Sequence, residues 1–300
     1  MPKNPVQDAE AVLMFSGGMD SSLTAAHLAE RFRKVHLITY RSRRLARVES
    51  SRINARKLAA IYGSDRVVHT IIDLHDEQRE LLEQVPADYV EYCSTSAPGV
   101  LCLGCKLTMY TRTLVYCLEH GVTHAADGAL RVQADHPECM PGTLNAIKVL
   151  FAEYGVAFDS PFYEVGSKRE VRQLLADKGI ELGPMFGATS RKEQPFCLLG
   201  PFTTIWHFDA PYDEDQMERY VHDKLPLLRR RIRRELEQRG LSEHEALATP
   251  LPVPPEALYE RRPIVMQVEF GPRRDRWLSR SLGPVWWTLD RAMRWSSQRG

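Results

Sequence analysis

Short apolar runs alternate with amphipathic stretches over the first two thirds of the chain. The runs end in glycine or polar residues and predict buried strands, and the stretches between them place apolar residues three and four positions apart, as helices do. The predicted strands are residues 11–15, 34–40, 67–73, 122–126 and a short one closed by 158–161, and the predicted helices are residues 21–32, 47–62, 75–85, 106–120, 143–154 and 167–179. This alternation predicts an α/β fold, a doubly wound, five-stranded parallel sheet of Rossmann-like type with right-handed crossovers.

The pattern changes in the last third of the chain. Residues 213–240 predict one long helix with a dense basic face, which Pro226 is placed to break. Residues 249–263 contain five prolines and predict a linker, and residues 264–270 predict a strand. We therefore expect a main domain over residues 1–205 and a mainly helical extension, rich in Arg and Trp, over residues 206–300.

A glycine- and serine-rich loop joins the first predicted strand to the first predicted helix. Its sequence is Ser16-Gly17-Gly18-Met19-Asp20-Ser21-Ser22. The two glycines allow positive φ and a close backbone approach, and the following helix offers free N–H groups and the positive end of its dipole. With the serine hydroxyls added, the stretch predicts an anion site, and phosphate is the obvious anion.

This loop lacks the Gly-Lys-Ser/Thr of a Walker motif and resembles the SGGxDS loop of the PP-loop ATP pyrophosphatases. The resemblance implies that the chain binds ATP and Mg²⁺, adenylates a substrate and releases pyrophosphate. It implies nucleotide contacts from residues 16–22 and, near the end of the second strand, from Tyr40. Asp20 would position Mg²⁺ or the attacked phosphorus, and Asp127 with Gly128, at the end of the fourth strand, would meet Mg²⁺ or the ribose.

Composition excludes several classes of protein. Apolar residues make up 43% and charged residues 26% of the 300 positions, as in ordinary globular chains. The 40 basic residues balance 39 acidic ones, so net charge gives no sign of nucleic-acid binding. No apolar run reaches membrane-spanning length, and Met1-Pro2-Lys3-Asn4 lacks the apolar core of a signal peptide. We expect a cytoplasmic protein with no membrane partner.

Cysteine placement predicts metal or redox chemistry, since six cysteines are many for a cytosolic chain of this size. Cys102 and Cys105 lie one turn apart at the start of a predicted helix, where the dipole should lower the pKa of their thiols and Gly104 should leave room for a cluster. Cys197 follows 92 positions after Cys105, where the chain should return to the same edge of the sheet. These residues alone are compatible with an iron–sulfur cluster with one open iron, with a metal-free persulfide relay, and with a zinc or purely structural role.

The same spacing resembles the iron–sulfur branch of the PP-loop sulfurtransferases, such as the two-thiocytidine tRNA synthetases, the archaeal four-thiouridine synthetases and the pyridinium dithiocarboxylate sulfurtransferases. Residues 102–110 (CLGCKLTMY) are particularly similar to the C-x-x-C-K-x-x-M-Y of the four-thiouridine group. The resemblance implies a [4Fe–4S] cluster held by Cys102, Cys105 and Cys197, with these three and Asp20 as catalytic residues.

A second resemblance points to zinc. Cys93, Cys102 and Cys105 have the spacing of part of the Zn²⁺ motif of the cyano-deazaguanine synthases, but position 108, where the fourth cysteine would follow, is Thr. That motif also usually lies near the chain end.

The expected function is therefore an ATP-dependent sulfurtransferase that replaces an acceptor oxygen with sulfur and releases AMP and pyrophosphate. The acceptor is a tRNA base or a small molecule, and the sulfur donor is sulfide or the persulfide of a cysteine desulfurase; a homodimer is compatible with the sequence. The alternatives are a zinc-containing PP-loop ligase that forms an amide or nitrile, and a metal-free persulfide relay. The basic face at residues 229–234 could bind RNA, but interleaved glutamates favour a solvated surface.

Overall fold

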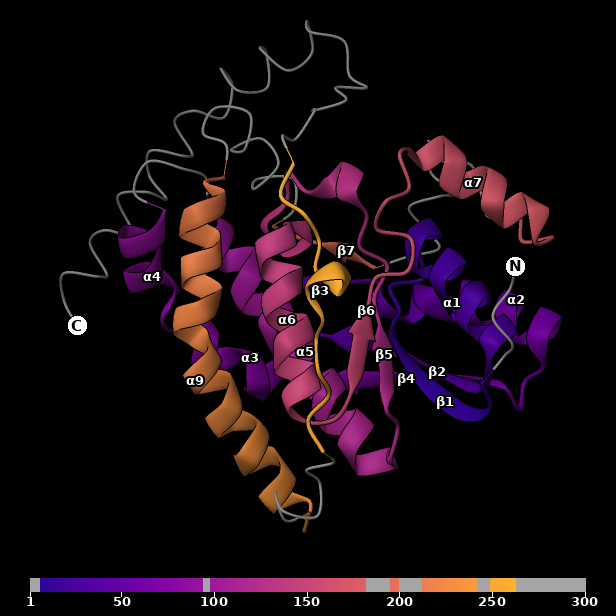
Figure 1. Ribbon diagram of the computed structural model, residues 1–300, viewed down its shortest axis with the longest axis horizontal. Helices are drawn as coiled ribbons and strands as arrows, with labels where there is room; N and C mark the ends of the chain where they lie inside the picture. Colours follow the sequence, from indigo (N-terminus) through magenta and orange to yellow (C-terminus); the bar gives the residue numbers. More distant parts are fainter. Residues whose placement is uncertain (1–5, 94–97, 182–194, 200–211, 242–248, 263–300) are drawn as a thin grey trace, which may run out of the picture.

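The computed structural model describes residues 6–93, 98–181, 195–199, 212–241 and 249–262. Figure 1 shows a central sheet with helices on both sides. Its strands are β1 (Val6–Met14), β2 (Phe32–Arg41), β4 (Val67–Asp73), β5 (His124–Ala126) and β6 (Ala157–Asp159). They are all parallel, in the order β4-β2-β1-β5-β6, so the predicted five-stranded α/β fold is confirmed.

The helices begin and end close to their predicted positions, with two exceptions. They are α1 (Met19–Arg31), α2 (Ser51–Tyr62), α3 (His75–Leu82), α4 (Val85–Tyr92), α5 (Gly99–His120), α6 (Pro141–Glu153), α7 (Lys168–Asp177) and α9 (Glu214–Gln238). Helix α4 was not predicted, and α5 begins seven residues earlier than expected because 99–105 is helical too. None of the described helices is long and apolar enough to cross a membrane.

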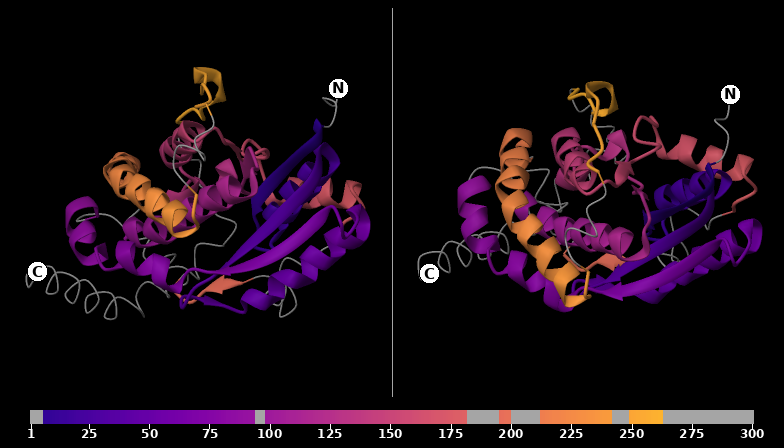
Figure 2. Two further views of the ribbon diagram at one scale, coloured as in Figure 1. Left: turned by 90° about the horizontal axis from the view of Figure 1, so that it is seen from below. Right: turned by 60° about the horizontal axis from the view of Figure 1, so that its bottom comes forward.

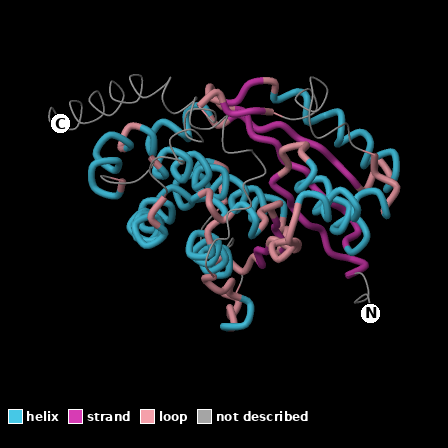
Figure 3. The backbone as a smooth tube through the Cα atoms, turned by 90° about the horizontal axis from the view of Figure 1, so that it is seen from above, coloured by secondary structure: helices cyan, strands magenta, loops and turns pink. Residues whose placement is uncertain are grey.

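Strand β1 lies at the centre of the sheet, and both of its faces are buried. Val12 and Met14 face one hydrophobic cluster, whereas Ala11, Leu13 and Phe15 face another. Because side chains alternate along a strand, a continuous apolar run is what a strand buried on both faces requires. Helices α1, α2 and α7 cover one face, and α4, α5, α6 and α9 cover the other (Figures 2 and 3).

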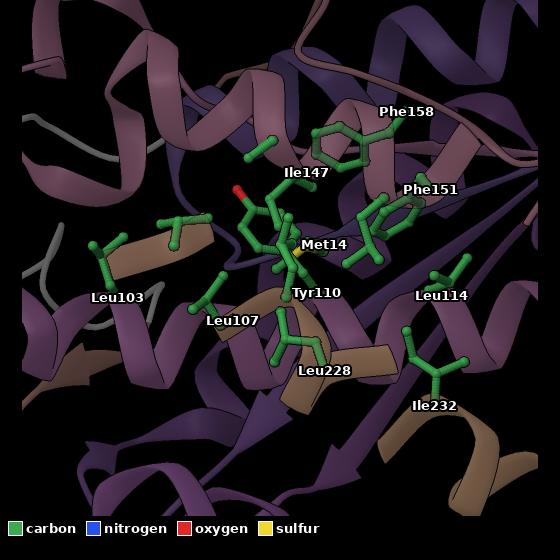
Figure 4. Packing of buried hydrophobic residues seen from close by; sticks show 14 of the residues in the cluster. Met14, Leu103, Leu107, Tyr110, Leu114, Ile147, Phe151, Phe158, Leu228 and Ile232 are labelled. Atoms are coloured by element: carbon green, nitrogen blue, oxygen red, sulfur yellow. The ribbon is translucent and has the colours of Figure 1, made fainter. Parts of the chain in front are cut away.

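Helix α9 belongs to the same core as the sheet. Figure 4 shows Leu228 and Ile232 of α9 packed near Leu107 and Leu114 of α5, and all four side chains are fully buried. The helix runs on through Pro226, so the predicted break is absent. The division at residue 205 stays a prediction, but α9 is not a separate appendage.

Residues 249–262, here called the C-terminal strap, are held against the domain. Leu251 N–H donates to the Ala152 carbonyl (2.9 Å), and Tyr259 exchanges two hydrogen bonds with the Asn145 side chain (2.8 and 3.0 Å). Lys148 donates to the Ala257 carbonyl at 2.7 Å. The proline-rich stretch is therefore an anchored segment, and its prediction as a linker is wrong. The predicted strand at 264–270 and the tail tryptophans lie outside the described residues.

Candidate nucleotide and thiol site

The glycine-rich loop closes tightly between β1 and α1. Gly17 has φ of 77°, a conformation that favours glycine. Gly18 N–H donates to Ser16 Oγ at 3.2 Å, and the hydroxyls of Ser16 and Ser21 lie 3.1 Å apart. Ser21 Oγ donates to the Gly18 carbonyl at 3.1 Å, so the Ser16 and Ser21 hydroxyls are bonded within the loop, whereas the buried Ser22 hydroxyl has no hydrogen-bond partner among the described residues. The loop lies at the start of α1, where N–H groups and the helix dipole favour an anion.

Side chains from neighbouring elements hold the loop from behind. Asn54 of α2 donates to the Gly17 carbonyl at 2.7 Å, and Thr39 of β2 donates to the Phe15 carbonyl at 2.6 Å. His69 of β4 lies 2.8 Å from the Thr39 hydroxyl, whose proton is already given to Phe15, so the histidine Nε2 is the donor. Burial lowers the pKa of His69 to about 4, which keeps its ring neutral at physiological pH.

Gly128 approaches the loop closely enough to exclude any side chain. A Cβ at this position would lie 2.8 Å from the backbone nitrogen of Ser21 and 3.0 Å from the Asp20 carbonyl carbon. Gly128 thus has a packing role at the start of α1, which the sequence analysis did not distinguish from a direct nucleotide contact.

Lys168 is a site residue that the sequence analysis did not single out. It forms an ion pair with Asp20 across 148 positions of the chain. Ser167 Oγ accepts a hydrogen bond from Glu170 N–H at 3.1 Å, which begins α7 at Lys168 and directs this residue toward the loop. Asp20 Oδ1 is buried and has no hydrogen-bond partner among the described residues. A carboxylate oxygen without a partner, beside a lysine and a phosphate cradle, fits Mg²⁺.

Asp127 lies fully buried below this site. Its Oδ1 accepts from Ala129 N–H (3.0 Å) and from the Ser160 hydroxyl (2.7 Å), and its Oδ2 accepts from Tyr110 (2.7 Å) and lies 3.4 Å from Lys106 Nζ. The four donors match the roughly four lone-pair sites of a carboxylate. Asp127 therefore joins β5, α5 and the segment after β6, and a ribose or Mg²⁺ would have to displace one of these partners.

Lys106 extends from α5 toward the same edge and is a quarter exposed. Burial lowers the pKa of Lys106, but the charge of Asp127 and the nearby Cys139 and Glu138 raise it, and the net result is a raised pKa. Lys106 therefore carries a positive charge at the edge of the sheet where the ATP loop lies.

Tyr40 does not offer its side chain to this edge. It is buried in the core, and its hydroxyl lies 2.6 Å from Thr113 Oγ1 of α5. Burial raises its pKa. Only the backbone of Tyr40 is positioned for the nucleotide contact that the resemblance implied.

The structure brings Cys105 and Cys197 to the same region. Cys197 lies in β7 (Phe196–Cys197), which pairs antiparallel with β3 (Leu45–Ala46) just beyond the end of β2. The chain thus returns to the sheet edge as the spacing predicted. Burial and the nearby Cys197 raise the pKa of Cys105, Arg44 lowers it, and the net value is about 11.

Two expectations about the Cys-x-x-Cys pair are wrong. Both cysteines lie inside α5, because the helix begins at Gly99, and burial outweighs any lowering of the Cys105 pKa by the helix dipole. Gly104 does not leave space at a cluster either. A Cβ there would make ordinary contacts with the Tyr220 hydroxyl (3.4 Å) and Leu81 (3.9 Å), so this glycine faces α9 and α3.

Cys102, Cys105 and Cys197 are the thiols that the resemblance implies as ligands of a cluster. Within the residues that the structure describes, no three His, Cys, Asp or Glu side chains lie close enough to hold a metal ion. Cys102, Cys105 and Cys197 are thiols, the kind of ligand that a [4Fe–4S] cluster takes, but the described structure does not bring the three within one coordination sphere. The four-cysteine zinc set fits less well, because Thr108 is buried with its hydroxyl bonded to the Gly104 carbonyl (3.0 Å).

The remaining cysteines have other surroundings. Cys93 is fully buried. Burial raises its pKa, the N–H groups of Val100 and Gly99 lower it, and the net value is about 11. Its sulfur therefore lies at the start of α5. Cys117 is packed in the core, and burial raises its pKa.

The basic face of α9 is largely neutralised by carboxylates of the same chain. Arg229 pairs with Glu153 (2.7 Å), Arg234 with Glu80 (2.7 Å), and Arg239 with Glu119 (3.0 Å). Arg231 is buried and pairs with Glu235 at 3.0 Å. These arginines attach the helix to the domain, which weakens the hypothesis that they bind RNA.

The chain is similar to one protein family and to several solved structures. A family model described as "Queuosine biosynthesis protein QueC" matches residues 10–189. No curated protein sequence matches the chain. Similar solved structures include a predicted subunit of tRNA methyltransferase from Methanocaldococcus jannaschii (19% identity, TM-score 0.39, covering 79% of this chain and 92% of that one). They also include the U34-tRNA thiolase NcsA from Methanococcus maripaludis with its [4Fe–4S] cluster (15% identity, TM-score 0.41, covering 77% of this chain and 73% of that one).

Proposed function

The chain belongs to the QueC family of PP-loop ATP pyrophosphatases, and we propose that it is an ATP-dependent sulfurtransferase that activates its acceptor as an adenylate. One observation carries this proposal. Cys105 and Cys197, far apart in the sequence, lie in the same region beyond the carboxyl ends of the strands, at the same edge of the sheet as the ATP loop. Ligands of open α/β sheets bind at this edge.

The loop residues would hold ATP in the following way. The N–H groups at the start of α1, with the serine hydroxyls released from their bonds within the loop, would bind the pyrophosphate portion. Asp20 coordinates Mg²⁺ through its unpaired Oδ1, and Lys168 neutralises phosphate charge. Lys106 stabilises the negative charge that develops at the α-phosphate.

The reaction has two displacements. The acceptor oxygen attacks the α-phosphorus of ATP, the bond between the α- and β-phosphates breaks, and pyrophosphate leaves. Sulfide then attacks the acceptor carbon, the carbon–oxygen bond breaks, and AMP leaves with the oxygen. Where the donor is a persulfide, its terminal sulfur makes this attack, and a second thiol then attacks the carrier sulfur. That step breaks the sulfur–sulfur bond, releases the thiolated acceptor and leaves a disulfide, which an external thiol reductant reduces. Adenylation is needed because the unmodified oxygen is a poor leaving group.

The thiols would carry the sulfur to the acceptor. Cys102, Cys105 and Cys197 would hold a [4Fe–4S] cluster, which when bound supplies an open iron that binds sulfide. In the metal-free alternative, two of these thiols would pass a persulfide between them by thiol–disulfide exchange. Both versions need Cys197 beside Cys105. The acceptor is a tRNA base or a small molecule.

Membership of the QueC family favours one other function. A zinc-containing ligase that forms an amide or nitrile would also adenylate its substrate, but it would transfer nitrogen. Cys93, Cys102 and Cys105 would then be the thiolate ligands of Zn²⁺, with the fourth ligand supplied by a residue other than Thr108.

The products of ATP cleavage test adenylation directly. We expect purified protein, given α-³²P-ATP and an acceptor extract, to release AMP and pyrophosphate and no ADP. Asp20→Asn should reduce the rate roughly a hundredfold, since it removes the Mg²⁺ ligand. Asp177→Asn, an exposed acid at the end of α7, is the control. Formation of ADP in place of AMP would contradict the proposal.

A further inference from the structure

A hollow lined by arginines lies beside the thiols and contains no residue of the ATP loop. Its volume is about 270 Å³, and it is here called the arginine hollow. Its lining residues are Arg43, Arg44, His75, Gln78, Arg79, Leu82 and Glu83. They come from the segment after β2 and from α3, which follows β4, so the hollow lies on the β2–β4 half of the edge.

Two of the lining arginines are free to bind an anion. Arg43 and Arg44 form no ion pair with any described residue, whereas the nearby Arg41 pairs with Glu49. Arg79 lies 3.2 Å from Asp76, and His75 pairs with Asp73. Glu83 is the one carboxylate in the lining. Two unpaired guanidinium groups against one carboxylate leave the hollow positive, and guanidinium groups match phosphate geometry.

The hollow is joined directly to the thiols. The Arg44 carbonyl accepts a hydrogen bond from Leu198 N–H at 2.8 Å, and Leu198 follows Cys197. On the other side, Gln78 Nε2 donates to Cys105 Sγ at 3.1 Å. A group bound among these arginines is therefore held next to both cysteines.

We infer that the arginine hollow binds a phosphate group carried by the acceptor and so places the acceptor beside Cys105 and Cys197. The inference rests on the proposed function, because it identifies the occupant as the acceptor. The volume supports a part of a larger ligand, since whole ligands usually occupy roughly 300–1,000 Å³. The ATP phosphates have their own cradle at residues 16–22.

Binding without turnover tests this inference, and so it is independent of whether sulfur transfer occurs. The protein is first saturated with Mg²⁺ and a non-hydrolysable ATP analogue, which fills the loop, and inorganic phosphate is then titrated calorimetrically. We expect one phosphate per chain, with affinity reduced at least tenfold in Arg43→Gln/Arg44→Gln. Arg43→Lys/Arg44→Lys keeps the charge but loses the guanidinium geometry, so its phosphate affinity should lie between those of the wild type and Arg43→Gln/Arg44→Gln.

The control variant is Arg56→Gln/Arg230→Gln, which removes two exposed arginines outside the hollow. It should bind phosphate as the wild type does. Equal phosphate affinity in the wild type and in Arg43→Gln/Arg44→Gln would overturn the inference. An equal loss of affinity for the ATP analogue would also overturn it, because the hollow would then belong to the ATP site.

Two further titrations identify the source of the phosphate. If uridine 5′-monophosphate binds as tightly as a ten-nucleotide RNA, the acceptor is of nucleotide size. If the RNA binds more tightly, and Arg43→Gln/Arg44→Gln lowers its salt slope by about 0.7 per lost phosphate contact, the acceptor is a polynucleotide. Either result supports the hollow as the phosphate site, and binding of neither probe would overturn it.

Discussion

Two glycines, one in the loop and one after β5, explain why the loop holds its shape. Gly17 supplies the positive φ, and Gly128 brings the end of β5 against the loop backbone. The glycine-rich motif made the role of Gly17 predictable from the sequence. The role of Gly128 depends on which strand lies beside β1, and no local pattern gives a contact between positions 128 and 21.

We predict that Gly128→Ala destabilises the loop. The added methyl group would lie 2.8 Å from Ser21 N, so unfolding free energy should fall by about 1–3 kcal/mol and ATP affinity should fall with it. Urea unfolding and nucleotide titration measure the two effects. Gly166→Ala is the control, because its nearest contact would be 3.7 Å away. Normal ATP affinity in Gly128→Ala would refute the close-approach argument.

The Asp20–Lys168 pair should matter for binding rather than for folding. Both side chains are more than a fifth exposed, so Lys168→Met should change stability by less than about 1 kcal/mol. ATP affinity should fall roughly tenfold or more, because a charged phosphate contact is lost. Lys178→Met removes a similar pair with Glu30 far from the loop and should leave ATP affinity unchanged. A large stability loss without a binding loss in Lys168→Met would show that the lysine is structural.

At the scale of elements, the sequence predicted the strands better than the helix ends. Buried strands are recognisable because both faces must be apolar, as at 11–15 and in most of 34–40. The start of α5 was missed because residues 99–105 contain glycines and cysteines, which give little helical signal. Because α5 begins at Gly99, Cys102 and Cys105 lie inside the helix and not at its first residues. The low thiol pKa expected at a helix start therefore depended on a boundary that only the structure gave.

Strand β4 supports the loop through His69, and this makes stability depend on pH. The ring is neutral when folded, with a pKa of about 4, whereas the unfolded chain takes up a proton near pH 6.5. The contribution of neutral His69 to the free energy of unfolding is therefore fully present above pH 6.5. It is lost as the pH falls toward 4, because the unfolded chain then binds a proton that the folded chain does not.

His69→Gln keeps an amide donor near the Nε2 position and does not titrate. Its unfolding free energy should fall less steeply than that of the wild type between pH 6.5 and 4, by a difference of about 2–3 kcal/mol across the window. Urea unfolding at several pH values measures this. Parallel pH curves would show that His69 does not carry the effect.

For the whole molecule, α9 is the element that sequence reasoning placed least well. Its basic stretch suggested a solvated or RNA-binding surface, yet its apolar stripe closes the core over α5 and its arginines pair with carboxylates of the domain. The sequence of α9 is recognisably amphipathic, but α5, on which its apolar side packs, lies more than a hundred positions earlier in the chain. Long-range pairing of this kind is not encoded in any local window.

Because α9 is part of the core, Leu228→Ala should destabilise the whole domain by about 2–5 kcal/mol. Unfolding should remain a single transition when followed by circular dichroism and by tyrosine fluorescence. Arg230→Ala, at an exposed position of the same helix, should change stability by less than about 0.5 kcal/mol. A separate, early transition in Leu228→Ala would indicate that α9 folds as an independent unit.

The metal content of anaerobically purified protein tests the central claim most directly. Iron, acid-labile sulfide and zinc should be measured in the wild type, in Cys197→Ala and in Cys93→Ala. The account predicts about four irons and four sulfides per chain in the wild type and in Cys93→Ala, and their loss in Cys197→Ala. One zinc without iron, lost in Cys93→Ala and kept in Cys197→Ala, would contradict the account and favour the ligase.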